Sequence, residues 1–501
     1  MPLIGVDVGT SGCKCVIYNT DGGISGCSYS EYSQETHTGG YVELDPEMVW
    51  RHVAKTIAQA AKDIRFEGPA ALSVSSFGEA GVALDSKGRV LCNSLMYTDP
   101  RGQEELHDIT GIVSPDEIME ITGLPAHSMY TLPKLLWLKR NRRDFFEHIW
   151  KFLLYEDFIS YRLCGETAID YSLASRTMAF DVVNKRWSDR MLDVLDVKET
   201  FFANPCQAGT PVGIVLPNVA AELGLPHGTI VAAGGHDQAC AALGAGVLDD
   251  GRAVNGMGTA DCITTVFDRP VRNSVMLSNN FNCEPFLLPD KYISLSFTFT
   301  GGALLKWYRN CFGADYTKRA HADNVSVYAL MDREIPPEPT NLLVLPHFDG
   351  AGTPHMDPAS TGAMIGLTME TTPSHVYKSL LEGVAYEMRL NLEYMDRAGI
   401  SIDELTAVGG GSSSREWLQI KADIFNRPIL TLSVGEAGTL GAAMLAGTAA
   451  GVFDSCAQAA GHLVNEKERF LPDADKAAQY DMLYGRYKKL YTSVKNICSD
   501  I

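Results

Sequence analysis

The chain has 501 residues, which is longer than one ordinary hydrophobic core serves, so two or more domains are expected. Apolar residues make up 46% and charged residues 21%, and this average globular mixture excludes disordered, collagen-like and coiled-coil proteins. The balance of 42 Lys and Arg against 61 Asp and Glu gives a net charge of −19, without the positive field that a nucleic-acid binder needs. A basic run at 139–143 is interpreted as a solvated helix end.

The N-terminus and the cysteines indicate where the protein works. The chain enters an apolar segment almost at once, without the basic region and apolar core of a signal peptide. No apolar run approaches the ~18 residues of a membrane span. Twelve cysteines occur without a Cys-x-x-Cys pair, which favours buried free thiols in a reducing compartment. We therefore expect a cytoplasmic protein with neither a membrane nor a nucleic acid as partner.

The first 25 residues predict a strand, a glycine turn and a second strand. Leu3–Val8 is apolar, the turn is rich in small residues, and the segment from Lys14 to Asn19 alternates. Backbone N–H groups, hydroxyls and one ammonium in such a turn can hold phosphate oxygens, while Asp7 can hold Mg²⁺ through water. An ordinary tight hairpin is the alternative interpretation. The candidate phosphate-binding residues are Gly9, Thr10, Ser11 and Lys14.

A helix is predicted next, from Asp45 to about Ile64, with Asp45-Pro46 as its cap and first-turn proline. Ala70–Val74 reads as a short buried strand, and residues 104–225 are expected to be mostly helical from their 3.6-residue apolar spacing. Three charged residues follow short strands on loops, where polar ligand contacts collect, although each could be a solvated loop charge. They are Glu79, Asp99 and Arg101.

The segment around Asp237 predicts a strand, a glycine turn and a helix. Ile230–Ala233 is the strand, Gly234 and Gly235 the turn, and the helix begins near Gln238. A carboxylate at such a place lies where open α/β sheets bind substrates, and it could accept a proton from an attacking hydroxyl. Asp is also a preferred helix N-cap, and one residue can do both. For His236, a packing or hydrogen-bonding role is favoured over a catalytic one.

The second half of the chain repeats the pattern of strands that lead into glycine-containing turns. A strand leads into the turn at 256–261, and a later strand, 405–408, enters a run of three glycines and three serines with a helix after it. Glycines allow close approach of the backbone to a ligand, although a strained strand-to-helix turn would need them too. Two α/β domains of related build are predicted, over 1–246 and 247–501. The candidate ligand-binding residues of the second are Gly258, Thr259, Gly409, Gly410, Gly411 and Ser412.

Five ordered segments together resemble the FGGY carbohydrate kinases, the group of xylulokinases, glycerol kinases and relatives. The resemblance covers roughly residues 3 to 495 and implies an α/β fold of two actin-like (ribonuclease H-like) ATPase domains, with ATP and sugar in the cleft between them. The segments are 7–14, 129–141, 234–238, 362–367 with 381–383, and 409–414.

The resemblance also implies roles for individual residues. Asp237 would be the catalytic base and Asp7 the acid associated with Mg²⁺. The first phosphate loop would include Thr10 and Lys14, and the second Gly258 and Thr259, while Gly409, Gly410 and Gly411 would form the adenosine loop. Sugar contacts would come from Glu79, Asp99, Arg101 and Gln238. The implied reaction transfers the γ-phosphate of Mg-ATP to a hydroxyl of a ketose, such as xylulose or another pentulose or hexulose. A homodimer or another homo-oligomer is expected.

Two departures from the family bear on the sugar. Gly78 stands where glycerol kinases carry an Arg, and Met129 where they carry a Tyr; xylulokinases carry Met-His in place of Gly78-Glu79. We therefore predict a pocket that is wider and less polar at that end, and a five- or six-carbon ketose or sugar alcohol phosphorylated ahead of glycerol. A kinase of glycerol or of a larger sugar alcohol is the alternative. Outside this class, an actin-like ATPase that drives a partner or a filament and a catalytically silent sugar sensor share the fold.

Overall fold

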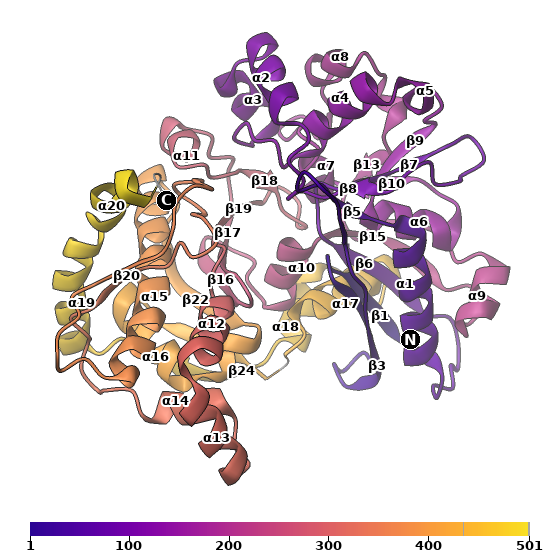
Figure 1. Ribbon diagram of the computed structural model, residues 1–501. Helices are drawn as coiled ribbons and strands as arrows, with labels where there is room; N and C mark the ends of the chain where they lie inside the picture. Colours follow the sequence, from indigo (N-terminus) through magenta and orange to yellow (C-terminus); the bar gives the residue numbers. More distant parts are fainter. Residues whose placement is uncertain (434, 499–501) are drawn as a thin grey trace.

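The computed structural model describes residues 1–433 and 435–498 and shows two lobes, each built on a mixed β-sheet (Figure 1). The sheet of the first lobe has the strand order β14-β15-β6-β1-β2-β3, and that of the second lobe has the order β18-β19-β17-β16-β22-β23-β24. The first sheet comprises β1 (Leu3–Val8), β2 (Gly12–Tyr18), β3 (Ile24–Glu31), β6 (Ala71–Ser76), β14 (Pro211–Ile214) and β15 (Ile230–His236). The second comprises β16 (Gly251–Met257), β17 (Asp261–Phe267), β18 (Glu284–Pro285), β19 (Tyr292–Thr298), β22 (Ile402–Val408), β23 (Ile429–Leu432) and β24 (Glu466–Phe470).

The two sheets share one plan. In the first lobe β1 runs antiparallel to β2 and parallel to β6, and β15 continues the parallel set. In the second lobe β16 runs antiparallel to β17 and parallel to β22, which is followed by β23. The parallel strands are apolar because helices cover both of their faces. The prediction of two α/β halves of related build, each with a strand–glycine-turn–strand unit, is confirmed.

Helices surround both sheets. The predicted helix after residue 45 is confirmed as α1 (Pro46–Ala61), whose N-cap carboxylate, Asp45 Oδ1, accepts a hydrogen bond from Glu47 N at 2.9 Å. None of the helices over the described residues combines the length and the apolar character that a membrane span requires. The first lobe adds α2 (Gln103–Ile112), α3 (Pro115–Thr122), α4 (Thr131–Asn141), α6 (Tyr155–Cys164), α7 (Tyr171–Ser175), α8 (Asp189–Leu195), α9 (Pro217–Leu223) and α10 (Asp237–Gly244). The second half of the chain adds α12 (Gly302–Phe312), α13 (Ala314–Asp323), α14 (Val327–Arg333), α15 (Pro373–Ala398), α16 (Arg415–Phe425), α17 (Ala437–Ala449), α18 (Cys456–Leu463), α19 (Ala474–Tyr487) and α20 (Leu490–Cys498).

Helices α10 and α17 cross at the junction of the lobes (Figure 1). Their backbones touch closely, because a Cβ at Gly441 would collide with the backbone of Cys240, and one at Gly244 with the backbone of Ala437. Although α17 lies between β23 and β24 of the second sheet in the sequence, it packs against β1, and its Thr439 Oγ1 lies 2.8 Å from Tyr18 Oη of the neighbouring β2. The C-terminal half of the chain therefore supplies part of the first lobe's core.

The predicted glycine turn before Asp237 is wrong. Strand β15 extends through Gly234 and Gly235 to His236, and α10 begins directly at Asp237. Gly234 lies against the backbone of Val74 on β6, so a side chain there would collide with that strand. Gly234 therefore serves close strand packing, and Asp237 stands at the carboxyl end of a parallel strand without an intervening loop.

Candidate active site

The first glycine turn joins β1 to β2 and is closed by a hydrogen bond from Gly9 N to Gly12 O, 2.9 Å long. Thr10 is half-buried and Ser11 is exposed at its tip. Lys14 lies opposite Asp7 in the strand pair, but its ammonium is held by both carboxylate oxygens of Glu436, each 2.9 Å away. Sequence reasoning missed Glu436, which comes from the segment leading into α17.

Asp7 is fixed at the end of β1. Its Oδ1 accepts a hydrogen bond from Ser75 Oγ on the neighbouring strand at 2.8 Å. Burial raises the pKa of its carboxyl group, and the nearby charge of Glu436 raises it further, while Lys14 opposes this. Among the described residues, no group of three or more His, Cys, Asp or Glu could hold a metal ion by itself. A cation at Asp7 would need oxygen ligands from water or from a phosphate as well.

The second glycine turn joins β16 to β17 and is closed by a hydrogen bond from Gly258 N to Ala260 O at 3.0 Å. The backbone carbonyl of Thr259 accepts hydrogen bonds from Gly301 N at 2.8 Å and from Ala303 N at 3.0 Å, at the start of α12. Behind the turn, Asp261 is fully buried, and its Oδ2 lies 2.6 Å from the ammonium of Lys421 on α16. The turn is therefore anchored to two helices while Gly258 and Thr259 face solvent.

The third glycine turn follows β22 and lies beside the second. Gly409 has a φ of +87°, and Cβ atoms at Gly409 and Gly411 would stand 3.0 Å and 2.8 Å from atoms of Met257, the last residue of β16. A Cβ at Gly410 would meet nothing within 4 Å. Ser412 folds back, with its Oγ donating to Gly409 O at 2.7 Å. The fold thus brings the second and third turns together and leaves Gly410 as the open position.

Asp237 is the first residue of α10, and the N-cap of this helix is His236. The interpretation of Asp237 as the N-cap is therefore wrong by one residue. Its side chain keeps 31% of its surface exposed, and Nε2 of His236 lies 3.4 Å from its Oδ1. Burial raises the pKa of Asp237 to about 7, helped by the negative charges of Asp7 and Glu79 and opposed by hydrogen bonds from Gln238. Burial and the charge of Arg176 hold the pKa of His236 well below its usual range, so this imidazole is neutral.

Glu79 belongs to a buried ion-pair cluster that spans both lobes. Its Oε1 accepts hydrogen bonds from Nε of Arg176, at 2.7 Å, and from Nη2, and Nη1 of Arg176 reaches Glu284 of β18. Glu284 also accepts a hydrogen bond from Asn282. The guanidinium carbon of Arg176 lies 5.1 Å from the ring centroid of Tyr130. Sequence reasoning missed Arg176, Glu284 and Asn282.

The predicted widening of the pocket at Gly78 is wrong. A Cβ at Gly78 would stand 2.8 Å from Cγ and 3.1 Å from Cβ of Arg176, so the stem of Arg176 fills the space that Gly78 leaves. The site is therefore no less polar there, because Arg176, the C-cap residue of α7, brings a guanidinium to the same place. The other departure, Met129, lines a small cavity between the lobes together with Tyr130, Arg176, Asn282, Phe297 and Met356.

Asp99 and Arg101 pair with one another and with the strand β5 (Val42–Leu44). Nη2 of Arg101 lies 2.6 Å from Asp99 Oδ2 and 2.8 Å from Glu43 Oε1. The ammonium of Lys134 donates to the backbone carbonyls of both residues, and Lys134 also lines a narrow space beside Glu79. Lys134 is thus the residue that lies between the pair and the space beside Glu79, and the charges of Asp99 and Arg101 are already satisfied within the first lobe.

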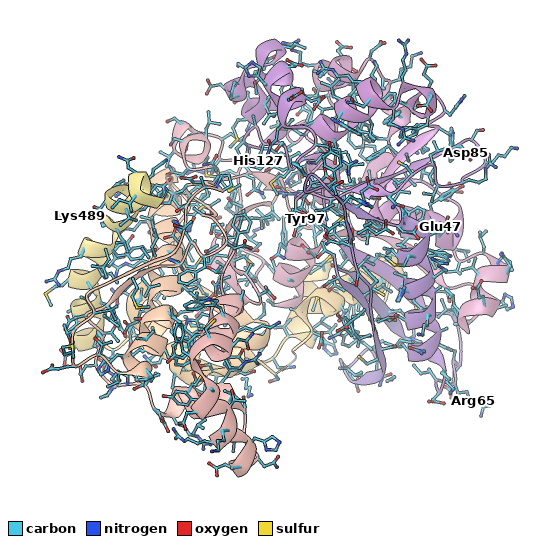
Figure 2. All side chains as sticks on the ribbon, viewed as in Figure 1. Glu47, Arg65, Asp85, Tyr97, His127 and Lys489 are labelled. Atoms are coloured by element: carbon cyan, nitrogen blue, oxygen red, sulfur yellow. The ribbon has the colours of Figure 1, made fainter. Side chains whose placement is uncertain are left out.

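Tyr97 connects these predicted residues and was missed from the sequence. Burial raises the pKa of its phenol, and the charges of Glu79 and Asp237 raise it further, so Tyr97 lies near both carboxylates. Figure 2 shows Tyr97 where the two lobes face each other, with His127 above it. Gln238, next to Asp237, accepts a hydrogen bond from Cys262 Sγ at 3.3 Å, which links α10 to β17 of the second lobe.

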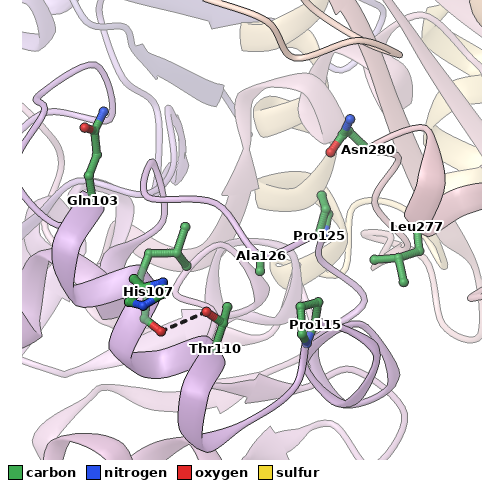
Figure 3. Close-up of a pocket in the computed structure, with 9 residues that line it drawn as sticks. Gln103, His107, Thr110, Pro115, Pro125, Ala126, Leu277 and Asn280 are labelled. Atoms are coloured by element: carbon green, nitrogen blue, oxygen red, sulfur yellow. Dashed lines mark hydrogen bonds between the residues drawn. The ribbon is translucent and has the colours of Figure 1, made fainter.

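A larger groove opens beside this region (Figure 3). It has a volume of about 420 Å³ and is lined by residues of α2, α3 and α11 (Ser274–Ser278), including His107 and Leu277. Pro125 and Asn280 line both this groove and the small cavity that contains Arg176. None of the predicted site residues lines the groove.

Comparison with known proteins agrees with this architecture. Sequence models of the N-terminal and C-terminal domains of the FGGY family of carbohydrate kinases match residues 2–244 and 253–450. The xylulose kinase of Bacillus subtilis is 30% identical over 99% of this chain and 97% of its own length, and that of Escherichia coli is 28% identical over 97% and 98%. The crystal structure of gluconate kinase from Lactobacillus acidophilus superposes with a TM-score of 0.89 at 25% identity, covering 98% of each chain.

Proposed function

Because the chain belongs to the FGGY family of carbohydrate kinases, we propose that it phosphorylates a neutral ketose, a pentulose or hexulose such as xylulose, with Asp237 as the catalytic base. The observation that carries the proposal is the position of Asp237. It heads α10 at the carboxyl end of a parallel strand, keeps part of its side chain exposed, and lies within electrostatic reach of both Asp7 and Glu79.

The charges around Asp237 favour a neutral sugar. The charges of Asp7 and Glu79 act on Asp237, and the guanidinium of Arg176 beside Glu79 is already shared between Glu79 and Glu284. An aldonic acid such as gluconate would bring a further negative charge to this surplus, and like charges at short range repel. Hydroxyl groups, in contrast, can donate to carboxylates without repulsion, which supports a ketose over an acid of the same length.

Nucleotide phosphates would lie between the first two glycine turns. The tip of the first presents Thr10 and Ser11, and the second presents Gly258 and Thr259. Lys14 would exchange Glu436 for phosphate oxygens, because its ammonium can serve either anion. Carboxylate oxygens suit Mg²⁺, so Asp7 would hold this ion through water, and the bound ion would neutralise charge on the phosphates.

Asp237 would act on the sugar hydroxyl that attacks the γ-phosphate. Its carboxylate would orient the hydroxyl in line with the phosphate and accept the proton late, as phosphoryl transfer demands little earlier base assistance. Most of the rate would come from positioning and from neutralisation of phosphate charge. Glu79, Tyr97 and Gln238 are the neighbours able to bind the other hydroxyls, since all three lie against Asp237 or share its electrostatic environment.

Free thiols are consistent with a reducing cytoplasm, which we propose as the site of action. The cysteines whose side chains the structure describes are free, and several, such as Cys15 and Cys240, are buried. Burial raises the pKa of Cys240 well above its usual range, which keeps the thiol protonated and unreactive.

A panel of acceptors tests the proposed function. We expect kcat/KM for a pentulose or hexulose to exceed that for glycerol by roughly 10²-fold or more, because a small ligand leaves buried polar groups without partners. Gluconate should be the poorest acceptor of its length, because of its charge. ADP release would be measured with pentuloses, hexuloses, pentitols, glycerol and gluconate. Glycerol or gluconate as the best acceptor would contradict the proposed substrate class.

Gly410→Val tests the adenosine loop. The side chain would enter the open space at Gly410, so the fold should tolerate it, while an approaching adenosine would meet two extra methyl groups. We expect KM for ATP to rise about tenfold or more with little change in KM for the sugar. Gly68→Val is the matched control, because Gly68 is also exposed with nothing within 4 Å of its Cβ. An unchanged KM for ATP in the folded variant would mean that the glycines serve only the turn.

The pH dependence of kcat/KM tests the base. With a pKa of about 7, Asp237 is protonated and inactive below that pH, so kcat/KM for the sugar should fall about tenfold per pH unit on the acid side. Glu79→Gln removes a negative charge that raises this pKa, so the acid limb should move to lower pH. Profiles from about pH 5.5 to 9 would be compared. A flat profile across this range would exclude Asp237 as the titrating base.

A further inference from the structure

We propose that Arg176 is a positioning residue of the sugar subsite, which uses the space left by Gly78 to fix the carboxylate of Glu79 and ties it to Glu284 of the second lobe. This inference rests on the proposed function, in which Glu79 binds a sugar hydroxyl. It assigns to a residue outside the predicted motifs the task of orienting a substrate-binding group.

Glu79 needs an external support because its own backbone is unusual. Its φ of +65° lies in the left-handed region, which a residue other than glycine adopts only when its surroundings hold it there. The backbone carbonyl of Glu79 accepts a hydrogen bond from Thr131 Oγ1 at 2.5 Å, which holds the main chain. Arg176 holds the side chain through Nε and Nη2, both of which donate to Oε1. A single carboxylate oxygen, Oε1, therefore takes both bonds, and Oε2 takes no part in the pairing with Arg176.

The support depends on the absence of a side chain at residue 78. The Cβ and Cγ atoms of Arg176 occupy the volume next to Gly78, at 3.1 Å and 2.8 Å from the position of a Cβ there. A residue with a side chain at 78 would push the stem of Arg176 aside and move the guanidinium away from Glu79. Gly78 and Arg176 thus form a matched pair, and neither can change without affecting the other.

Arg176 also makes the sugar subsite depend on the second lobe. Nη1 donates to Glu284, which is fully buried in β18, and the amide of Asn282 binds the same carboxylate. Asn282 is fixed in turn, because its Oδ1 accepts a hydrogen bond from Leu295 N of β19 at 2.7 Å. The chain of contacts runs from Glu79 through Arg176 to two strands of the second sheet. Glu79 is therefore linked through Arg176 to the second lobe.

Three substitutions test the proposal from different sides. Arg176→Lys keeps the charge but replaces the fork of donors with one ammonium, which cannot serve Glu79 and Glu284 in the same geometry. Gly78→Ala leaves every charged group in place and displaces the stem of Arg176. Glu284→Gln weakens the link to the second lobe. For each, we expect KM for the ketose to rise about tenfold and KM for ATP to stay within about twofold.

Two controls separate this role from a general loss of structure. Arg190→Lys alters an exposed Arg–Glu pair, with Nε of Arg190 lying 2.8 Å from Glu117 Oε1, and Gly68→Ala adds a methyl group in open space. Both should keep wild-type KM values. In the double variant Gly78→Ala with Arg176→Ala, the collision with Cγ is gone, so the two effects on KM should be less than multiplicative.

Glu79→Gln distinguishes the failure of this inference from the failure of the proposed function. If Glu79→Gln raises KM for the ketose while Arg176→Lys and Gly78→Ala leave it unchanged in folded protein, the positioning role of Arg176 is wrong and the sugar role of Glu79 stands. If Glu79→Gln itself leaves KM for the ketose unchanged, the proposed sugar contact fails and the inference fails with it. Equal rises in KM for ketose and ATP would also overturn it, since they would indicate a structural role.

Discussion

Asp237→Asn should lower kcat by roughly 10²- to 10⁴-fold while KM for the sugar changes only a few-fold. The amide keeps the shape of the side chain and its hydrogen bonds with the start of α10, but it cannot accept the proton of the attacking hydroxyl. The loss should therefore appear in turnover rather than in binding. Steady-state kinetics with the best ketose of the panel would measure both parameters.

The matched control for this variant is Asp116→Asn. Asp116 lies in the first turn of α3, as Asp237 lies in the first turn of α10, but it is exposed on the surface. An acid near a helix N-terminus stabilises the helix by about 0.3–1 kcal/mol, so Asp116→Asn should lose about that much stability. Burial and the charges of Asp7 and Glu79 disfavour the ionised form of Asp237, so Asp237→Asn should not lose stability. Only Asp237→Asn should lose activity. If its turnover stays within a few-fold of wild type, Asp237 serves α10 and not the reaction.

Lys421→Met should destabilise the protein by about 3–5 kcal/mol, because it leaves Asp261 as a buried charge without its partner. Both side chains are fully buried, and the ammonium lies 2.6 Å from Asp261 Oδ2 and 2.7 Å from Asn255 Oδ1. Urea denaturation would measure the change in the free energy of unfolding. Since Asp261 directly follows the second glycine turn, KM for ATP should rise as well.

Two further variants help to interpret the change in unfolding free energy of Lys421→Met. Removal of both charges in Asp261→Asn with Lys421→Met should cost less than Lys421→Met alone, because no ionised group is then left unpaired. Lys291→Met breaks a surface pair with Asp249 and Asp268 and should cost less than about 1 kcal/mol. A loss of that small size for Lys421→Met would mean that the buried pair does not hold the turn.

Local patterns predicted much of this fold because they act over few residues. A strand pattern beside small residues is enough to predict the three glycine turns, including the hairpin around Gly9–Ser11, and a capping side chain is enough to predict the cap at Asp45. The boundary at Asp237 was wrong for a related reason. Glycines usually mark turns, but Gly234 is needed for contact with Val74, more than 150 positions earlier, and a single sequence carries no signal of that neighbour.

The ion-pair cluster of Glu79, Arg176 and Glu284 could not be predicted either, because its members are far apart in the sequence. Arg176 lies 97 positions from Glu79 and 108 from Glu284, and only the packed fold brings the three together. One signal was present, since the missing side chain at Gly78 left a volume that something had to fill. The absence of a side chain at Gly78 predicted empty space instead, because nothing in the local sequence indicates that the stem of Arg176 fills this volume. The partner of Lys14, Glu436, is 422 positions away and was equally invisible.

The position of α17 has a consequence for how the protein is made. Leu440 and Met444 of this helix pack in one cluster with Leu3 and Val16, and Thr439 binds Tyr18. A ribosome releases the strands of the first lobe long before it reaches residue 437. Part of the apolar surface of that lobe therefore stays uncovered until nearly nine-tenths of the chain has emerged. Contacts so distant in sequence also slow folding. A fragment that ends near residue 246 should therefore aggregate when synthesised alone, and a separately supplied C-terminal fragment should rescue it.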